Sequence, residues 1–178
     1  MLLGAGSGAG RDDYSSMCMA RVGSVLFHGI AIKPGKPAVG GMIGDVPVLG
    51  VPGYPVSAIL ILENRFRPVA RWLCGLNPEL DVATAKARIS RQINSSLKYQ
   101  EFVRVRLGKV DENLTAVPLP RGAGIVSSFI KADGIMMIPQ NREGFSPGET
   151  AQVRLMRPES EISSALIITG SQIGRAHV

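Results

Sequence analysis

Three turns rich in glycine and proline carry the residues best suited to hold an anion. The first, GAGSGAG over residues 4–10, allows several backbone N–H groups to converge on a phosphate. The second, KPGKP, uses prolines that fix φ to hold Lys33 and Lys36 on a stiff frame. The third, PGYP, precedes Ser57 at the start of a helical pattern, where free N–H groups and a hydroxyl are available.

Each of these turns also has a purely structural interpretation. The glycine loop lacks GxGxxG spacing, so a tight strand-to-helix turn explains it equally well. KPGKP is compatible with a solvated turn, and PGYP with an ordinary helix start. Because the turns occur together, and loops at the ends of an α/β sheet commonly bind ligands, we favour a site for a multiply charged anion.

Two adjacent carboxylates, Asp12 and Asp13, follow the glycine loop. One of them is suited to cap the next helix. The other could hold Mg²⁺, which takes one or two carboxylates together with phosphate oxygens and waters. His28 has no second histidine, cysteine or acid at ligand spacing, so we interpret it as structural.

Composition excludes several classes of protein. The 178 residues are 45% hydrophobic and 19% charged, which is typical of a globular chain. No stretch approaches the roughly 18 apolar residues of a membrane helix, so we expect no membrane partner. The net charge of +6 is scattered and aromatic residues are sparse, so we expect no nucleic acid. Cys18 and Cys74 lack metal-type spacing and favour a reducing, cytoplasmic location.

Residues 1–77 are predicted to form a mixed α/β unit that positions these turns. Apolar runs predict short strands, two of which form a hairpin around Gly44 and Asp45. Helical periodicity predicts a helix after the glycine loop and a longer one with a buried face, kinked at Pro68. The predicted strands cover residues 1–3, 25–27, 30–32, 38–43 and 47–51, and the predicted helices cover residues 13–21 and 56–73.

Residues 78–158 are predicted to form a second, all-β domain. Alternation dominates from Val82 onward and predicts five or six short strands without a helix, arranged as a small barrel or sandwich. In the strand over 102–110, Val103 and Val105 lie on one face, whereas Arg104 and Arg106 lie on the other. We expect the valines to be buried and the arginines to face away from the core.

Both ends of the chain look cut. Residues 1–3 read as the end of a strand whose earlier partners are missing. Residues 159–172 are expected to be a linker and the start of a further domain, since 165–169 form an apolar strand without a partner. The final IGRAHV, residues 173–178, matches one reading frame of a common sequencing adapter, so we treat it as a non-native tail.

Three segments together resemble the MoeA-type molybdopterin molybdenumtransferases, the family that includes the E domain of gephyrin. They are GAGSGAGRDDY, VLFHGIAIKPGKPAVGG and PVLGVPGYPVSAILILENRFRPVARWLCG, in this order. The resemblance covers about residues 4–158, and KPGKP followed by PGxPVSA is specific to it. It implies part of a molybdopterin-binding, MogA-like three-layer α/β domain followed by a small β-barrel. It also implies further domains before this segment, and ALIITGS resembles the junction to a domain like a periplasmic substrate-binding protein.

The resemblance implies a molybdenum insertase, which inserts molybdate into adenylylated molybdopterin, releases AMP and uses Mg²⁺. Sites of this family are built across domains and across a homodimer, so we expect the chain to be inactive alone. The resemblance implies catalytic roles for Asp13, Lys33 and Lys36, with Asp13 also the metal ligand. It assigns substrate binding to Gly6, Gly8, Gly10, Pro37, Pro52, Gly53, Pro55, Ser57 and Ser128.

The sequence departs from the family pattern at positions that matter for oxyanion binding. The motif serine falls at Gly8, and Tyr99 stands where many members have an arginine that helps to hold molybdate. Lys98 or Arg104 could compensate for that loss. The departures favour an alternative function, a non-catalytic sensor or scaffold that binds molybdate or molybdopterin. Asp13, Lys33 and Lys36, which match the family pattern, favour catalysis. A related adenylyltransferase is disfavoured by the β-domain.

Overall fold

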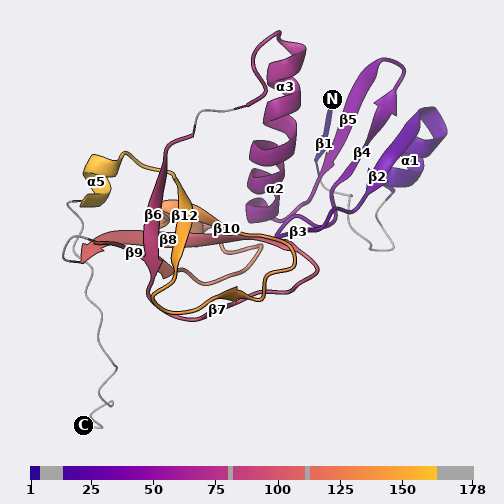
Figure 1. The fold of residues 1–178 in the computed structure, drawn as a ribbon. Helices are drawn as coiled ribbons and strands as arrows, with labels where there is room; N and C mark the ends of the chain where they lie inside the picture. The colour runs from indigo at the N-terminus through magenta and orange to yellow at the C-terminus, as the bar shows by residue number, and fades with distance from the viewer. Residues whose placement is uncertain (5–13, 80–81, 111–112, 164–178) are drawn as a thin grey trace, which may run out of the picture.

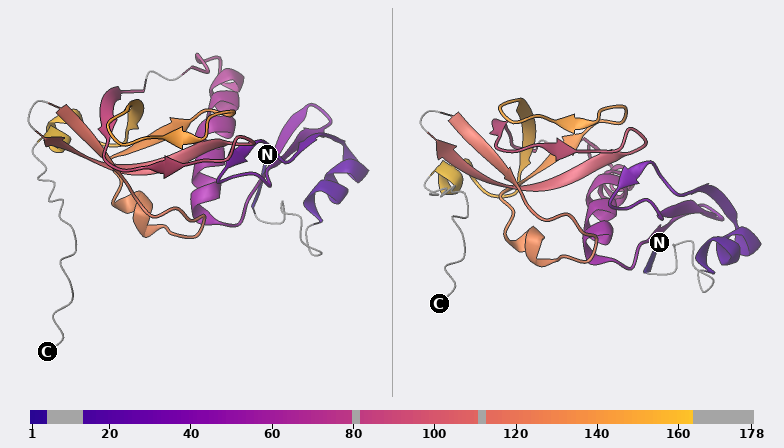
Figure 2. Two further views of the ribbon diagram at one scale, coloured as in Figure 1. Left: turned by 60° about the horizontal axis from the view of Figure 1, so that its bottom comes forward. Right: turned by 90° about the horizontal axis from the view of Figure 1, so that it is seen from below.

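The computed structural model describes residues 1–4, 14–79, 82–110 and 113–163. A mixed α/β unit is followed by a closed β-barrel, which confirms the predicted fold class (Figure 1). A long helical rod stands between the sheet of the first unit and the barrel, and further views show the same arrangement (Figure 2). The predicted glycine loop, most of the expected linker and the terminal tail lie outside the described residues.

The α/β unit is built on a four-stranded sheet in the order β1-β5-β4-β2. β4 and β5 form the predicted hairpin, and Gly44 at its turn has a φ of +56°, which glycine adopts without strain. Helix α1 follows the glycine loop and buries Met19 among side chains of the sheet. The elements are β1 (Leu2–Gly4), α1 (Ser15–Val22), β2 (Ser24–His28), β4 (Val39–Ile43) and β5 (Val46–Val51).

The helical rod joins three segments: α2 (Pro55–Ile61), the π-helical η1 (Leu62–Phe66) and α3 (Arg67–Leu73). Pro68 lies in the first turn of α3, where the missing N–H removes no intrahelical hydrogen bond. The π turn η1 lies directly before this proline, and the kink expected at Pro68 stays a prediction.

The predicted apolar face of the rod is buried only along α2. Val56 and Leu60 are fully buried there, but α3 buries none of its residues. Val69 lines an apolar groove of about 260 Å³ that separates α3 from β2 and β4, which leaves this side chain exposed. Trp72 of the same helix is also exposed.

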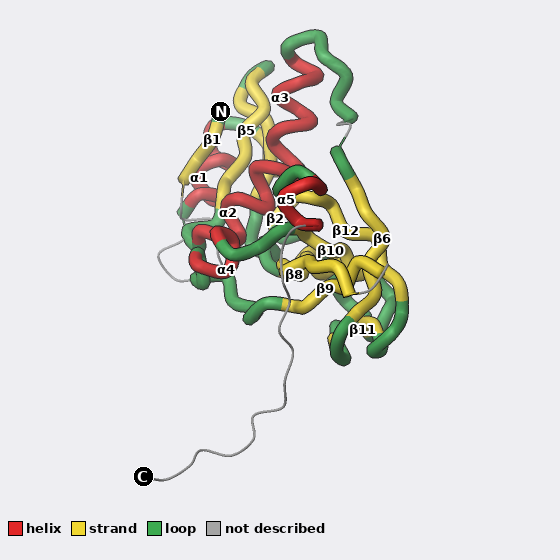
Figure 3. Tube along the Cα trace, turned by 90° about the vertical axis from the view of Figure 1, so that its left-hand side faces the viewer, coloured by secondary structure: helices red, strands yellow, loops and turns green. Residues whose placement is uncertain are grey.

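Five strands close the barrel in the order β10-β12-β6-β9-β8, and β8 pairs back with β10. This closure selects the barrel over the sandwich. Two short helices, α4 and α5, interrupt or follow the strands and were not predicted (Figure 3). The elements are β6 (Thr84–Ile89), β7 (Ile93–Asn94), β8 (Gln100–Val110), β9 (Asn113–Pro118), α4 (Ser127–Ile130), β10 (Gly134–Ile138), β11 (Gly144–Phe145), β12 (Thr150–Leu155) and α5 (Glu159–Ser163).

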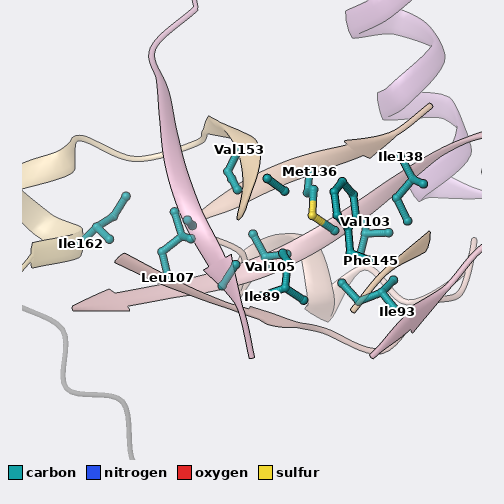
Figure 4. Close-up of a cluster of buried hydrophobic side chains, with 13 residues drawn as sticks. Ile89, Ile93, Val103, Val105, Leu107, Met136, Ile138, Phe145, Val153 and Ile162 are labelled. Carbon is teal, nitrogen blue, oxygen red and sulfur yellow. The ribbon is translucent and has the colours of Figure 1, made fainter. Parts of the chain in front are cut away.

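The barrel interior is filled by alternate side chains of its strands (Figure 4). Val103, Val105 and Leu107 of β8 point inward and are at most 1% exposed, as the alternation predicted. They pack with Ile138 of β10 and Val153 of β12, which are also fully buried. This cluster is the main core of the described chain.

A two-residue strand, β3 (Ile32–Lys33), joins the two units by pairing in parallel with the start of β8. β9 covers β8 only from Val105 onward, which leaves the first residues of the same β8 edge available to β3. The register places Lys33 opposite Glu101. The second lysine-bearing turn is therefore fixed directly against the barrel.

Truncation of the barrel core should cost stability. Leu107→Ala removes a side chain that is 1% exposed, so we expect the free energy of unfolding to fall by about 2–5 kcal/mol. Val110→Ala on the same strand is the control, since Val110 is 46% exposed and its truncation should cost less than about 0.5 kcal/mol. Urea denaturation measures both values, and equal losses would contradict the placement of this core.

Candidate functional site

A cavity of about 490 Å³ lies where β3, the start of α2 and the barrel meet. Its lining brings together segments that are distant in sequence: the KPGKP turn, the PGYP turn, the start of β8 and the segment after β9. The lining consists of residues 32–37, Tyr54, Ser57, Tyr99, Glu101, Phe102, Arg104 and residues 121–123. The cavity is therefore the candidate location for the anion site expected from the turns, of which KPGKP and PGYP contribute lining residues.

The KPGKP turn supplies two cations to this cavity. Gly35 has a φ of +124°, and a Cβ there would lie 3.1 Å from the Ile61 side chain, so the turn requires glycine. Lys33 and Lys36 are exposed and make no ion pair with any described residue. The Lys36 ammonium lies 5.8 Å from the centroid of the Tyr99 ring, within cation–π range. Both ammonium groups therefore remain available to an anion.

The start of α2 forms a second wall. Ser57 is buried and lines the cavity beside the exposed ring of Tyr54, and its role in substrate binding stays a prediction. The backbone N–H of Val56, one of the free donors of the helix start, donates to the carbonyl of Ala123 at 3.0 Å. This hydrogen bond ties α2 to residues 119–123, which we call the wall loop.

Glu101 and Arg121 form an ion pair across the barrel side of the cavity. The carboxylate of Glu101 is 3% exposed, and it accepts hydrogen bonds from Arg121 Nη1 and Ser95 Oγ, both at 2.9 Å. Arg121 Nη1 also donates to the carbonyl of Asn94 at 2.7 Å. The pair therefore links the wall loop to the segment between β7 and β8, and it leaves no uncompensated carboxylate in the cavity.

Arg104 is the most deeply buried cation of the lining. Its Nη2 donates to the carbonyls of Pro120 and Gly122 at 3.1 and 3.3 Å, and its guanidinium lies 5.9 Å from the Phe129 ring centroid. Burial lowers the pKa of Arg104 from its ordinary value. The alternation in β8 predicted that Arg104 lies on the strand face away from the barrel core, and the structure confirms this. This face is nevertheless buried, because the wall loop and Phe129 cover it.

The charge balance of the lining favours an anion. It contains the cations Lys33, Lys36, Arg104 and Arg121 against the single carboxylate Glu101. The carboxylate is matched by Arg121, so a net positive charge remains in a concave and partly desolvated space. Such an arrangement attracts a small, multiply charged anion.

The predicted site residues divide into three groups. Lys33, Lys36, Pro37 and Ser57 line the cavity together. Pro52 and Gly53 lie in the turn before α2 and Pro55 begins this helix, but none of the three lines the cavity. The buried Ser128 of α4 donates its hydroxyl to the carbonyl of Ile125. Gly6, Gly8, Gly10 and Asp13 lie outside the described residues, so their roles stay predictions.

The sequence analysis missed Glu101 and Arg121. A single acid within an alternating strand carries no signal of its own, and Arg121 lies in a loop that no periodicity marks. Of the two proposed substitutes for the missing arginine, Arg104 lines the cavity and Lys98 does not. Among the described residues, no group of three or more His, Cys, Asp or Glu is placed to hold a metal, and no helix is long and apolar enough to cross a membrane.

Comparison with known proteins defines the class to which this fold and site belong. Residues 1–72 match the profile of a probable molybdopterin binding domain, and residues 86–156 match the MoeA C-terminal region, domain IV. A putative molybdopterin biosynthesis protein of Methanocaldococcus jannaschii is 32% identical over 157 residues, which cover 88% of this chain and 36% of the relative. A molybdopterin molybdenumtransferase of Haemophilus influenzae is 26% identical over 158 residues, 86% of this chain and 38% of the relative.

A solved structure agrees with these matches. The crystal structure of a molybdopterin biosynthesis MoeA protein from Pyrococcus matches this chain with a TM-score of 0.67 and 34% sequence identity. The match covers 88% of this chain and 37% of the Pyrococcus protein. The chain belongs to the MoeA family of molybdenum cofactor biosynthesis, which confirms the resemblance. It spans a little over one third of the length of these relatives.

The ion pair between Arg121 and Glu101 should stabilise the wall loop. Arg121→Ala leaves a carboxylate that is 3% exposed without its cation, so we expect a loss of about 1–3 kcal/mol in the free energy of unfolding. Glu101→Gln combined with Arg121→Ala should cost little more than Glu101→Gln alone, because the charge is then absent. Urea denaturation of the single and double variants measures the coupling, and strictly additive losses would show that the pair does not interact.

Proposed function

We propose that this chain forms the oxyanion-binding part of a molybdenum insertase, which transfers molybdenum from molybdate to adenylylated molybdopterin and releases AMP. The observation that carries the proposal is the cavity lined by Lys33 and Lys36, whose charges have no ion-pair partner among the described residues. The matched molybdopterin-binding profile supports a molybdopterin-type substrate for this family. The relatives that bear the name molybdopterin molybdenumtransferase support the reaction.

The lining is suited to a tetrahedral dianion such as molybdate. The two lysines provide opposite charge from a turn that is rigid before the ligand arrives, so little conformational entropy is lost on binding. Ser57 adds a hydroxyl donor from the wall formed by α2. The same donors can stabilise the negative charge that develops on phosphate oxygens as AMP leaves, since they lie in a partly desolvated space.

The resemblance supplies the remaining parts of the proposal. Mg²⁺ would be held through Asp13 beside the glycine loop, where it would neutralise phosphate charge. A second copy of the chain would complete the site in a homodimer, in the cytoplasm and without nucleic acid or membrane as partner.

Tyr99 supports a second candidate function, a sensor or scaffold that binds molybdate or molybdopterin without turnover. Its ring faces the Lys36 ammonium, at a position where many members of the family have an arginine. A neutral ring in place of a cation lowers the positive charge available to an oxyanion. Binding without turnover in the experiment below would favour this function.

Substitution of the proposed catalytic residues should abolish cofactor formation and leave the fold intact. The full gene product would be incubated with adenylylated molybdopterin, molybdate and Mg²⁺, and AMP release would be followed together with reconstitution of a cofactor-free molybdoenzyme. We expect molybdate-dependent AMP release by the wild type and loss of both signals in Lys36→Ala and in Asp13→Asn, because each removes a charge that faces the substrates.

The matched control is Lys86→Ala, which removes an exposed lysine of β6 outside the cavity and should retain wild-type activity. Wild-type activity in either Lys36→Ala or Asp13→Asn would contradict the proposed site. If the wild-type protein binds molybdate or molybdopterin but releases no AMP, this result would contradict the insertase function and favour the sensor.

A further inference from the structure

One polar side-chain atom is buried without a hydrogen-bond partner in the described part of the chain, and it is Nε of Arg104. A buried N–H donor that makes no hydrogen bond costs free energy, so native proteins retain few of them. The side chain that carries this donor lines the cavity next to the KPGKP turn. The residue with the unpaired donor therefore belongs to the lining of the candidate anion site.

The other contacts of Arg104 fix its guanidinium in place. Nη2 donates to the two carbonyls of the wall loop, and Phe129 packs near the guanidinium plane. No hydrogen bond joins Nε or Nη1 to any of the described residues. The nearby carboxylate of Glu101 is already bound by Arg121 and Ser95. Arg104 thus keeps free donors beside the cavity on an immobilised and permanently charged group.

We propose that Arg104 binds an oxygen of the tetrahedral oxyanion in the cavity through its Nε–H, while its Nη2 holds the wall loop. This inference rests on the proposed function, because it assigns a further binding residue to the same site. Lys33 and Lys36 contact the anion from the KPGKP side, and Arg104 contacts it from β8. The anion is then held from both units of the chain, and it supplies the Nε donor with a partner that the described residues do not provide.

A purely structural role for Arg104 predicts a different response to a conservative substitution. Arg104→Lys keeps a positive charge that can donate to the carbonyls of the wall loop, but it has no Nε–H. A residue that only pins the loop should therefore be rescued by lysine in both stability and anion affinity. A residue that binds the anion should be rescued in stability alone.

Calorimetric titration of the full gene product with sodium molybdate tests the proposal, with sodium chloride as the blank. We expect Arg104→Lys to bind molybdate on the order of tenfold or more weakly than the wild type, because a charge-assisted hydrogen bond is lost. Its thermal midpoint should stay close to that of the wild type. Arg91→Lys is the matched control, since Arg91 Nη2 also donates to a backbone carbonyl, that of Pro118 at the end of β9 at 2.6 Å, but Arg91 does not line the cavity.

Each outcome of this titration decides something. Equal molybdate affinity of Arg104→Lys and the wild type would overturn the inference and leave the proposed function standing. Failure of the wild-type chain to bind molybdate would overturn both. If Arg104→Lys does not fold, the NMR signal of Arg104 Nε–H in the wild-type chain replaces it. Molybdate should shift this signal and chloride should not, and an unchanged signal would overturn the inference.

Discussion

The pairing of β3 with β8 is the interaction on which the cavity depends. It occupies two residues of each strand, yet it places the lysine turn of the α/β unit on the free edge of a barrel strand. β8 can accept β3 there because β9 leaves that part of the edge uncovered, while β10 holds the opposite edge. The hydrogen bond from Gln100 N–H to the carbonyl of Ala31 extends this contact. Without this junction the charged residues of the two units would not share one cavity.

The electrostatics of the cavity follow from how its charges are distributed between the units. The α/β unit contributes the lysines on an exposed turn, and the barrel contributes Arg104 and Arg121 together with Glu101. The ion pair of Arg121 and Glu101 serves the structure of the wall loop, since both groups are bound to neighbouring segments. The lysines make no ion pair within the described chain. The barrel thus supplies the charged groups that hold the wall loop, whereas the two lysines of the α/β unit form no ion pair among the described residues of the same cavity.

Much of the fold could be predicted from sequence because local patterns determine it. Alternation identified the inward face of β8, and Gly44 identified the hairpin of β4 and β5. The cavity could be predicted only in part, because its walls meet through tertiary contacts. Arg104 lies on the face that alternation assigns to it, but its burial depends on a loop some 16 to 18 residues later in the chain. Val69 shows the opposite case, since helical periodicity cannot reveal that α3 does not close against the sheet.

The wall loop lies outside the closed cycle of strand pairing that holds the barrel together. Its residues follow the end of β9 and precede α4, so no ladder of the barrel runs through them. An insertion or substitution in this loop can therefore reshape one side of the cavity without disturbing barrel closure or core packing. One wall of the cavity is thus encoded outside the strands that close the barrel, whereas Arg104 of the same lining belongs to one of these strands. Variation confined to the wall loop can change the shape of that wall while the barrel keeps its strand order.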